Sequence, residues 1–254
     1  MMEIVNEDEC NDTYGRMRMY YALKLKHEDD NLNVPGERTV YRIMNEIGLT
    51  HKPRRKPNGI TRADKLARKS DDLFKRDFTA EEPNQKAVTD ISEVKASDGK
   101  LYVSAIFDCY DLLVLGLCIE DNMKAGLCVN TINNTVQMHP EVRGIKCHSD
   151  RGSQYTSELY RAALHDNQII QSMNSSGGRC HDNARCESMW ARMKEELFYS
   201  RNRKSEDYTK TELKTMIWRY YMSYWNNRRI CSANDGLPPA VKRALYYQSL
   251  KVTA

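Results

Sequence analysis

The chain has 254 residues, of which 40% are hydrophobic and 29% charged, and this length can hold one full domain and a smaller one around a real core. The net charge of +4 is only mildly basic and is a weak indication of a polyanionic partner. The first thirty residues are polar and the most apolar run, Leu112 to Ile119, is too short to cross a bilayer, so we expect a cytoplasmic protein without membrane contact.

Two short helices are predicted near the N-terminus. Residues 1 to about 12 are acidic and aperiodic, so we expect a frayed end there. Apolar residues at helical spacing follow Gly15, and a second helix is expected from Glu37 to a stop at Gly48. Because a basic stretch comes next, we interpret residues 1–50 as a helix-turn-helix-like DNA-binding region, with an ordinary helical hairpin as the alternative.

Residues 51–86 form a predicted basic linker. From His51 to Arg76, ten basic residues stand against three acidic ones. Lysine and arginine bind DNA by releasing its counterions, so we interpret the segment as an arm that tracks phosphates. A solvated charge run is the alternative. A short helix is expected over 62–76, and the predicted DNA contacts are Arg54, Arg55 and Lys56.

A mixed sheet is predicted from residue 87 onward. Three apolar runs joined by short turns, one of them at Asp98-Gly99, indicate an antiparallel meander. Two further strands alternate with helices, and a helix between strands implies a parallel crossover. The expected strands are 87–94, 101–107, 112–119, 145–148 and 169–173, and the expected helices are 123–138, 157–167 and 183–199.

The C-terminal part of the chain is predicted to be helical. Bulky residues from Leu213 to Trp225 recur at helical spacing, and we interpret this aromatic face as packing that holds the region on the sheet. A last helix is expected over 238–250. Arg228 and Arg229, after the aromatic helix, are candidate phosphate contacts, with a solvated surface pair as the alternative.

Three acidic residues carry the candidate chemistry. Asp90 lies inside the first predicted strand, Asp150 follows the fourth, and Glu187 lies one turn into the helix over 183–199. A carboxylate in an apolar strand is costly unless something compensates it, and Asp90 comes beside Asp150 if the first and fourth strands are neighbours. A divalent metal would resolve their repulsion. We therefore predict a metal site for phosphoryl transfer on DNA; an exposed surface acid is the alternative for Glu187.

The eight cysteines show no Cys-x-x-Cys spacing, which favours reduced thiols in or near the core. Cys147-His148 and Cys180-His181 offer zinc-ligand types, but their spacing matches no common zinc module. A zinc site is therefore the lesser alternative.

Three sequence motifs resemble a known family. Thr89-Asp90-Ile91 is followed by His148-Ser149-Asp150-Arg151-Gly152-Ser153-Gln154-Tyr155, and then by Asp182-Asn183-Ala184 with Glu187-Ser188. The pattern is similar to the acidic-triad transposases of bacterial insertion sequences, and in particular to OrfB of the "IS three" group, whose core is similar to retroviral integrases. Tyr14-Gly15-Arg16 and Trp225-Asn226-Asn227-Arg228-Arg229 resemble further motifs of the family, so the likeness covers about residues 14–250.

The resemblance implies a fold and a domain order. We expect an α/β protein with a ribonuclease-H-like core over residues 87–200, in which helices flank a mixed five-stranded sheet. The N-terminal helical region and the basic linker precede this core, and a C-terminal helical extension over 201–254 follows it.

The resemblance also implies an activity. Asp90, Asp150 and Glu187 would be catalytic and would hold two Mg²⁺ ions, with Mn²⁺ as the alternative ion, for cleavage and strand transfer at insertion-sequence ends. Lys194 is expected to contact element-end DNA. The implied partners are double-stranded DNA of element ends and targets, further copies of this chain on DNA, and the protein of an upstream reading frame as a partner or fusion. The implied location is the bacterial nucleoid.

The chain departs from the family pattern at three points. Ala87 and His181 stand where the family has tryptophan, and the interval before Glu187 is one residue longer than expected. None of these departures removes a carboxylate. A strand transferase is therefore the main prediction, and its rivals are a catalytically silent regulator that binds element ends and a nuclease that cuts without joining.

Overall fold

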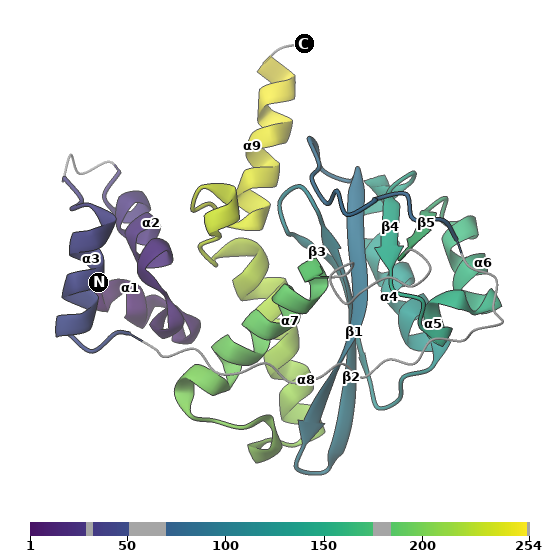
Figure 1. Ribbon diagram of the computed structural model, residues 1–254, viewed down its shortest axis with the longest axis horizontal. Helices are drawn as coiled ribbons and strands as arrows, with labels where there is room; N and C mark the ends of the chain where they lie inside the picture. The colour runs from purple at the N-terminus through teal and green to yellow at the C-terminus, as the bar shows by residue number, and fades with distance from the viewer. Residues whose placement is uncertain (29–32, 51–69, 175–183, 253–254) are drawn as a thin grey trace.

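The structure, a computed structural model, describes residues 1–28, 33–50, 70–174 and 184–252. A five-stranded sheet runs through the larger part of the molecule, with helices on both of its faces (Figure 1). The strands are β1 (Lys86–Ala96), β2 (Gly99–Asp108), β3 (Val114–Glu120), β4 (Lys146–Ser149) and β5 (Ile170–Met173).

The sheet has the strand order β3-β2-β1-β4-β5. The first three strands are antiparallel neighbours, whereas β4 lies parallel to β1 and β5 lies parallel to β4. The β1–β2 hairpin closes where Ala96 pairs with Gly99, at the predicted Asp-Gly turn. Gly99 has a φ of +140°, which residues with a Cβ rarely adopt. The predicted ribonuclease-H-like mixed sheet is confirmed, and its first and fourth strands are neighbours, which is the condition that the predicted metal site requires.

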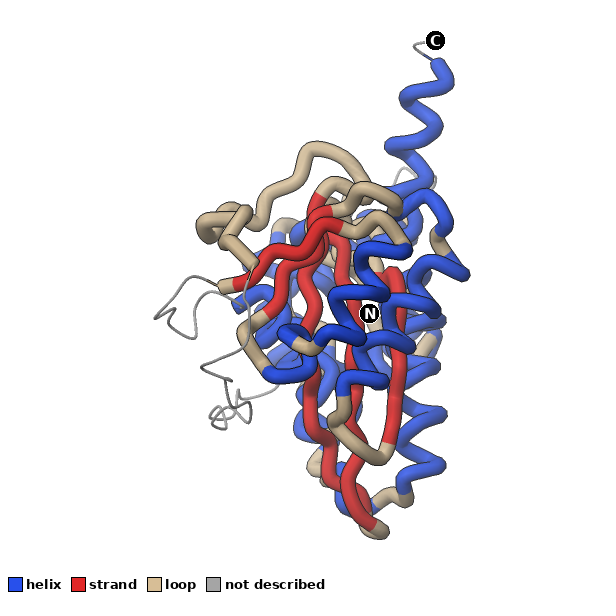
Figure 2. Tube along the Cα trace, turned by 90° about the vertical axis from the view of Figure 1, so that its right-hand side faces the viewer, coloured by secondary structure: helices blue, strands red, loops and turns tan. Residues whose placement is uncertain are grey.

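Helices lie on both sides of the strands (Figure 2), and each face of the sheet carries its own hydrophobic core. Side chains alternate along β1, so that Val88 and Val94 pack on the face of α7 while Ala87 and Ile91 pack on the face of α4. The helices of the first of these faces are α7 (Ala184–Leu197), α8 (Lys210–Trp218) and the π-helix η6 (Arg219–Trp225). Those of the second face are α4 (Ala125–Met138), α5 (Ser153–Thr156) and α6 (Glu158–Asp166).

The prediction of a frayed N-terminus is wrong. Residues 2–13 form the helix α1 (Met2–Glu7) and the 3-10 turn η1 (Glu9–Thr13), with Ile4 and Cys10 buried. The amide of Asn11 donates to the Ile4 carbonyl (2.7 Å) and its Oδ1 accepts from the Tyr224 hydroxyl (3.1 Å). The acidic composition of this segment masked the few apolar residues that dock it.

The two predicted helices that follow are confirmed as α2 (Arg16–Lys26) and α3 (Glu37–Glu46). Their buried residues are Met19, Ala22 and Leu23 on α2 and Val40 and Met44 on α3, whereas the apolar Leu25 is exposed.

The described part of the predicted basic linker packs on the sheet. Residues 62–69 lie outside the described residues, and 70–76 form no helix, against the prediction. The Asp72 carboxylate instead accepts from the amides of Phe74 and Lys75 and makes a turn. Beside it, the Met173 amide donates to the Asp71 carbonyl (3.1 Å), so this segment adjoins β5.

The aromatic C-terminal segment is helical and buried as predicted, but part of it has more residues per turn than the α-helix that we expected. After α8 the chain continues as the π-helix η6. Tyr220, Tyr221, Tyr224 and Trp225 are therefore all buried, while Trp218, expected on the inner face, is 46% exposed.

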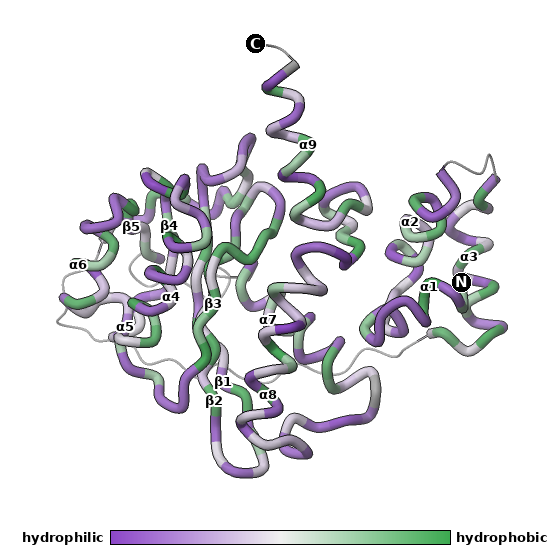
Figure 3. The backbone as a smooth tube through the Cα atoms, turned by 180° about the vertical axis from the view of Figure 1, so that it is seen from behind, coloured by the Kyte–Doolittle hydropathy of each residue, from purple (hydrophilic) through white to green (hydrophobic). Residues whose placement is uncertain are grey.

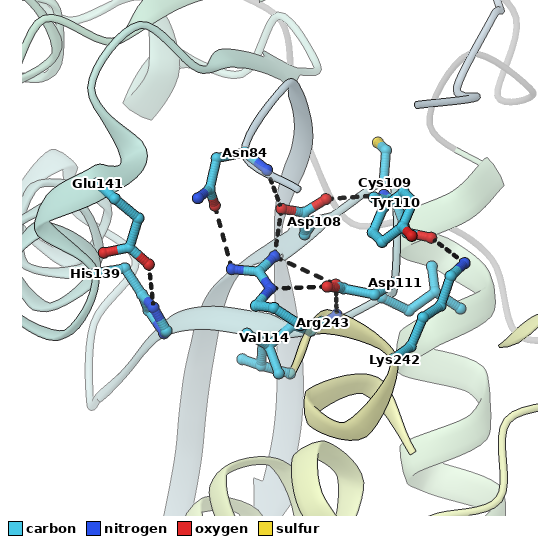
Figure 4. Close-up of polar contacts among 12 residues, drawn as sticks. Asn84, Asp108, Cys109, Tyr110, Asp111, Val114, His139, Glu141, Lys242 and Arg243 are labelled. Carbon is cyan, nitrogen blue, oxygen red and sulfur yellow. Dashed lines mark hydrogen bonds and ion pairs between the residues drawn. The ribbon is translucent and has the colours of Figure 1, made fainter. Parts of the chain in front are cut away.

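The last helix, α9 (Pro239–Val252), projects beyond the sheet (Figures 1 and 3). Its base is fixed to the β2–β3 turn by Arg243, whose guanidinium bonds the carboxylates of Asp108 and Asp111 (Figure 4). Lys242 adds a bond to the Tyr110 carbonyl (2.7 Å). Across the described ranges, none of the helices combines the length and apolar character that a membrane span requires.

Candidate active site

Asp90 and Asp150 lie on neighbouring parallel strands. Val88 of β1 is in register with His148 of β4, and two residues further along each strand come Asp90 and Asp150. Asp90 is within β1, while Asp150 directly follows the end of β4. The sheet therefore places both carboxylates at the same level, as the sequence predicted.

Asp150 is held by the turn that follows it. Its Oδ1 accepts a hydrogen bond from the Gly152 amide (2.8 Å). A Cβ at Gly152 would lie only 3.0 Å from that oxygen, so glycine allows the close approach of the backbone. This contact fixes one oxygen of the carboxylate.

Glu187 approaches from the helix that covers this face of the sheet. It lies in the first turn of α7, and Trp190, one turn later, donates from Nε1 to Oδ2 of Asp90 (3.2 Å). The Trp190 ring also packs edge-on against Phe107. Lys194, one turn further, donates to the Glu93 carbonyl of β1 (2.9 Å). Helix α7 is thus fixed to β1 at Asp90 and again at Glu93.

The pKa of Asp90 is shifted by the other two acids, which lie near it. Burial, the negative charge of Asp150 and, to a smaller extent, that of Glu187 together raise its pKa to about 7. The amide of Ile91 and the Trp190 indole oppose this shift, because hydrogen bonds stabilise the ionised form. A cation at this place would relieve the repulsion.

The donor set fits a hard divalent cation. Carboxylate oxygens are the side-chain ligands that Mg²⁺ and Mn²⁺ prefer, and no described Lys, Arg or His forms an ion pair with Asp90, Asp150 or Glu187. Within the described ranges, no three His, Cys, Asp or Glu side chains are yet gathered closely enough to hold a metal ion. The three acids are therefore within electrostatic reach of one another without forming a coordination sphere.

A second pair of buried carboxylates provides a contrast. Asp108 and Asp111 also lie close together, and burial and the Asp111 charge raise the pKa of Asp108 to about 6. The Arg243 guanidinium lies between them (Figure 4), with Nε 2.7 Å from Asp111. This pair is neutralised by the protein itself and serves to attach α9, whereas no basic residue in the described part of the chain forms an ion pair with Asp90.

Comparison with known proteins agrees with this arrangement. Residues 80–178 match the integrase core domain family. An uncharacterised transposase-like protein of Haemophilus influenzae is 33% identical over 204 residues, which cover 80% of this chain and 91% of that protein. The putative transposase InsK for insertion sequence element IS150 of Escherichia coli K12 is 30% identical over 92% of this chain and 78% of its own length. The chain belongs to the insertion-sequence transposases of the "IS three" group.

One relative is considerably longer than this transposase. The probable transposase for insertion sequence element IS1353 of Shigella flexneri is 32% identical over 234 residues, which are 89% of this chain but 42% of that protein. The chain thus spans less than half the length of that relative.

The residues that were predicted to contact DNA differ from one another in burial and in the groups around them. Lys194 is half-buried, and burial lowers the pKa of its ammonium group. Arg228 is exposed, with Nη1 3.5 Å from Asp8. Arg54, Arg55 and Lys56 lie outside the described residues, as does His181. The other departure from the family pattern, Ala87, is fully buried in the sheet.

Both alternatives considered for Arg229 are wrong. Its guanidinium is buried and donates to both oxygens of Glu196 (2.9 and 2.6 Å), a residue of α7. Arg18 of α2 and the Tyr220 hydroxyl complete the set of donors to this carboxylate (2.7 and 2.8 Å). These charges hold the pKa of Glu196 at about 2. The cluster ties the N-terminal helices to the helix that carries Glu187.

The contacts that hold the end of β4, just before Asp150, were not predicted from the sequence. His148 is buried, stacks on Phe74, and bonds Ser172 and Asn174 through its two ring nitrogens (2.8 Å each). Ser172 in turn accepts from the Leu73 amide, so the segment before β1 reaches the end of β4. The only signal in the sequence was a polar residue in an apolar strand next to the acidic motif.

The cysteines match the prediction of reduced thiols. None of the seven in the described residues forms a disulfide, and only Cys118 among them is not fully buried. Burial raises the pKa of the Cys147 thiol to about 12. Because Cys180 and His181 lie outside the described residues, the lesser zinc alternative stays a prediction.

Proposed function

We propose that this transposase cuts and joins DNA at the ends of its insertion sequence, with Asp90, Asp150 and Glu187 as the catalytic residues. The observation that carries the proposal is the raised pKa of Asp90, which is caused by burial and by the charges of the other two carboxylates. Perturbed acids in such a group favour a functional site over a purely structural one.

The three carboxylates would hold two Mg²⁺ ions, or Mn²⁺ in their place. The family resemblance implies that Asp90 would serve both ions, with Asp150 on one and Glu187 on the other. Bound there, the metals would activate the attacking oxygen and stabilise the leaving oxygen of an in-line phosphoryl displacement.

The protein residues position the reacting groups. Trp190 orients Asp90, Gly152 orients Asp150, and the attachment of α7 to β1 sets the approach of Glu187. In the proposed first step, water attacks the phosphodiester at the element end and frees a 3′ hydroxyl. In the second step, this hydroxyl attacks a target phosphodiester and displaces the 3′ oxygen of the target strand. Lys194 and Arg228 would contact DNA, and the active assembly would contain several copies of this chain.

The test is a strand-transfer assay with Mg²⁺ and labelled duplexes from the ends of the element. The wild-type chain should produce both cut ends and joined products, and Glu187→Gln should produce neither. Glu158→Gln is a matched control, because Glu158 is also an exposed glutamate in the first turn of a helix. Its activity should equal that of the wild type.

The other outcomes separate the rival functions. Binding without cleavage by the wild-type chain would support a silent regulator. Cut ends without joined products would support a nuclease. Undiminished activity of Glu187→Gln would contradict the catalytic assignment.

A further inference from the structure

Arg185 attaches the first turn of α7 to the turn that follows β2. Its Nη1 donates a hydrogen bond to the carbonyl oxygen of Cys109 (2.7 Å), and its side chain is half-buried. A charged donor makes this bond stronger than one between two neutral groups. Arg185 lies two residues before Glu187, so the bond is made beside the proposed catalytic glutamate.

Glu187 lies between two points at which α7 is attached to the sheet. Trp190 and Lys194 bond to β1, and both follow Glu187 in the sequence. Arg185 makes an attachment that precedes it. Without the Arg185 bond, the first turn would rest on the packing of Cys186 and on the two later attachments, and the ends of helices fray readily.

The Arg185 bond also opposes rotation of α7 about its own axis. Successive residues of an α-helix are about 100° apart around that axis. Arg185 and Glu187 therefore lie about 100° to either side of Cys186, which is fully buried against the sheet. A bond on the Arg185 side fixes the rotation of the first turn, and this rotation sets the direction in which Glu187 points.

The acceptor of this bond belongs to a firmly held turn. The Cys109 amide donates to the carbonyl of Lys86 at the start of β1 (2.9 Å). Asp108 and Asp111, on either side of Cys109 in the sequence, both bond to Arg243 (Figure 4). The turn is therefore a fixed point of the fold, and it holds the start of α7 in place.

We propose that Arg185 is a positioning residue that directs the Glu187 carboxylate toward Asp90 and Asp150. Its bond to Cys109 holds the first turn of α7 at the rotation that the second metal ion requires. The inference rests on the proposed function, because the role of Arg185 is exercised in the site of that function. A direct contact of Arg185 with DNA phosphate is the competing role that the experiment must exclude.

The first measurement uses the full chain without metal or DNA. Hydrogen–deuterium exchange followed by mass spectrometry reports how often each part of a helix opens. Arg185→Ala should speed the exchange of the amides of residues 188–191 about tenfold and should leave those of residues 194–197 unchanged. Equal acceleration in both segments, or none in the first, would overturn the proposal.

The second measurement is a calorimetric titration of the same proteins with Mn²⁺. The wild type should bind two ions, and Arg185→Ala should weaken one of them about 10- to 100-fold while the other keeps its affinity. Arg185→Lys keeps a charged donor that can reach the carbonyl, so it should recover most of the lost affinity. Arg192→Ala, at an exposed arginine of the same helix, is the matched control and should match the wild type in exchange and in Mn²⁺ binding.

Cleavage kinetics distinguish positioning from DNA contact. With saturating DNA, Arg185→Ala should cut more slowly than the wild type, and a higher Mn²⁺ concentration should restore the rate. Its affinity for the labelled duplex, measured by fluorescence anisotropy, should be unchanged. Weaker DNA binding together with normal Mn²⁺ binding would identify Arg185 as a DNA contact and would overturn the proposal.

The two proposals can fail separately. A wild-type chain that binds no Mn²⁺ and cuts no DNA would contradict the proposed function, whereas faster exchange confined to the first turn of α7 in Arg185→Ala would still support the hold of Arg185 on Glu187. Two Mn²⁺ ions that bind equally well to the wild type and to Arg185→Ala would overturn the role of Arg185 and leave the proposed function intact.

Discussion

Replacement of Asp90 by asparagine should stabilise the metal-free transposase while it abolishes DNA cleavage. Burial, Asp150 and Glu187 raise the pKa of Asp90 from 3.8 to about 7. A pKa raised by about three corresponds to about 4 kcal/mol at ~1.4 kcal/mol for each pH unit. The ionised Asp90 carboxylate therefore lowers the free energy of unfolding by at most this amount. Asparagine is uncharged, so the variant should not suffer this loss.

The effect of the substitution depends on pH in a defined direction. Because the folded protein holds the Asp90 proton more tightly than the unfolded chain does, this group lowers the stability as pH rises from about 4 to about 7. Below that pH range Asp90 is neutral in both the folded and the unfolded state, so Asp90→Asn should have nearly the same stability as the wild type. Above the range the variant should show the full gain in stability over the wild type.

Thermal unfolding followed by circular dichroism in EDTA measures this gain. At pH 8 the Asp90→Asn variant should melt higher by several degrees, with an upper limit of about 15 °C, and at pH 3, below this range, the two proteins should melt together. Glu158→Gln, which removes an exposed carboxylate, should match the wild type at both values. Equal or lower stability of Asp90→Asn at pH 8 would refute the view that the other acids destabilise an ionised Asp90.

Three further predictions follow from the same contacts. Trp190→Phe removes a hydrogen bond that lowers the pKa of Asp90, so Mn²⁺ binding in calorimetric titrations should require a higher pH than in the wild type; an unchanged pH dependence would exclude this role. Glu196→Gln leaves Arg229 and Arg18 without a buried counterion, and urea unfolding should show a loss of about 3 to 5 kcal/mol; a loss below 1 kcal/mol would contradict the assigned burial. EDTA should stop DNA cleavage, and either Mg²⁺ or Mn²⁺ should restore it, whereas cleavage that continues in EDTA would exclude metal dependence.

The strands and the antiparallel or parallel sense of their connections could be predicted because their signals are local. An Asp-Gly turn defines the first hairpin, and helices between the later strands require parallel crossovers. The adjacency of β1 and β4 was only a condition of the predicted site, and the structure meets this condition, which puts Asp90 at the level of Asp150. The motif resemblance supplied Glu187, because nothing in a single exposed glutamate separates it from an ordinary surface acid.

The parts that could not be predicted depend on contacts between distant segments. Arg229 looks like a surface residue in the sequence because its counterion, Glu196, is 33 residues away. The N-terminal segment looks like a solvated acidic end because its partner, Tyr224, lies at the other end of the chain. The π-helix shifts the inner face of the aromatic segment by a change of helical period, which a search at the α-helical period cannot detect.

The position of Lys194 also depends on tertiary structure. Helical spacing places it on the same side of α7 as Glu187, but the fold directs its ammonium group to the Glu93 carbonyl of β1. Its predicted contact with DNA would therefore require this hydrogen bond to be exchanged for a phosphate.

A crystal structure with Mn²⁺, in which the anomalous scattering of the ion locates it, tests the central claim most directly. The account predicts manganese between Asp90 and Asp150, with Glu187 completing a second site, and no ion at Asp108 and Asp111, where Arg243 takes the place of a cation. Manganese bound elsewhere, or a Glu187 side chain that stays out of contact with the ions when DNA is present, would contradict it.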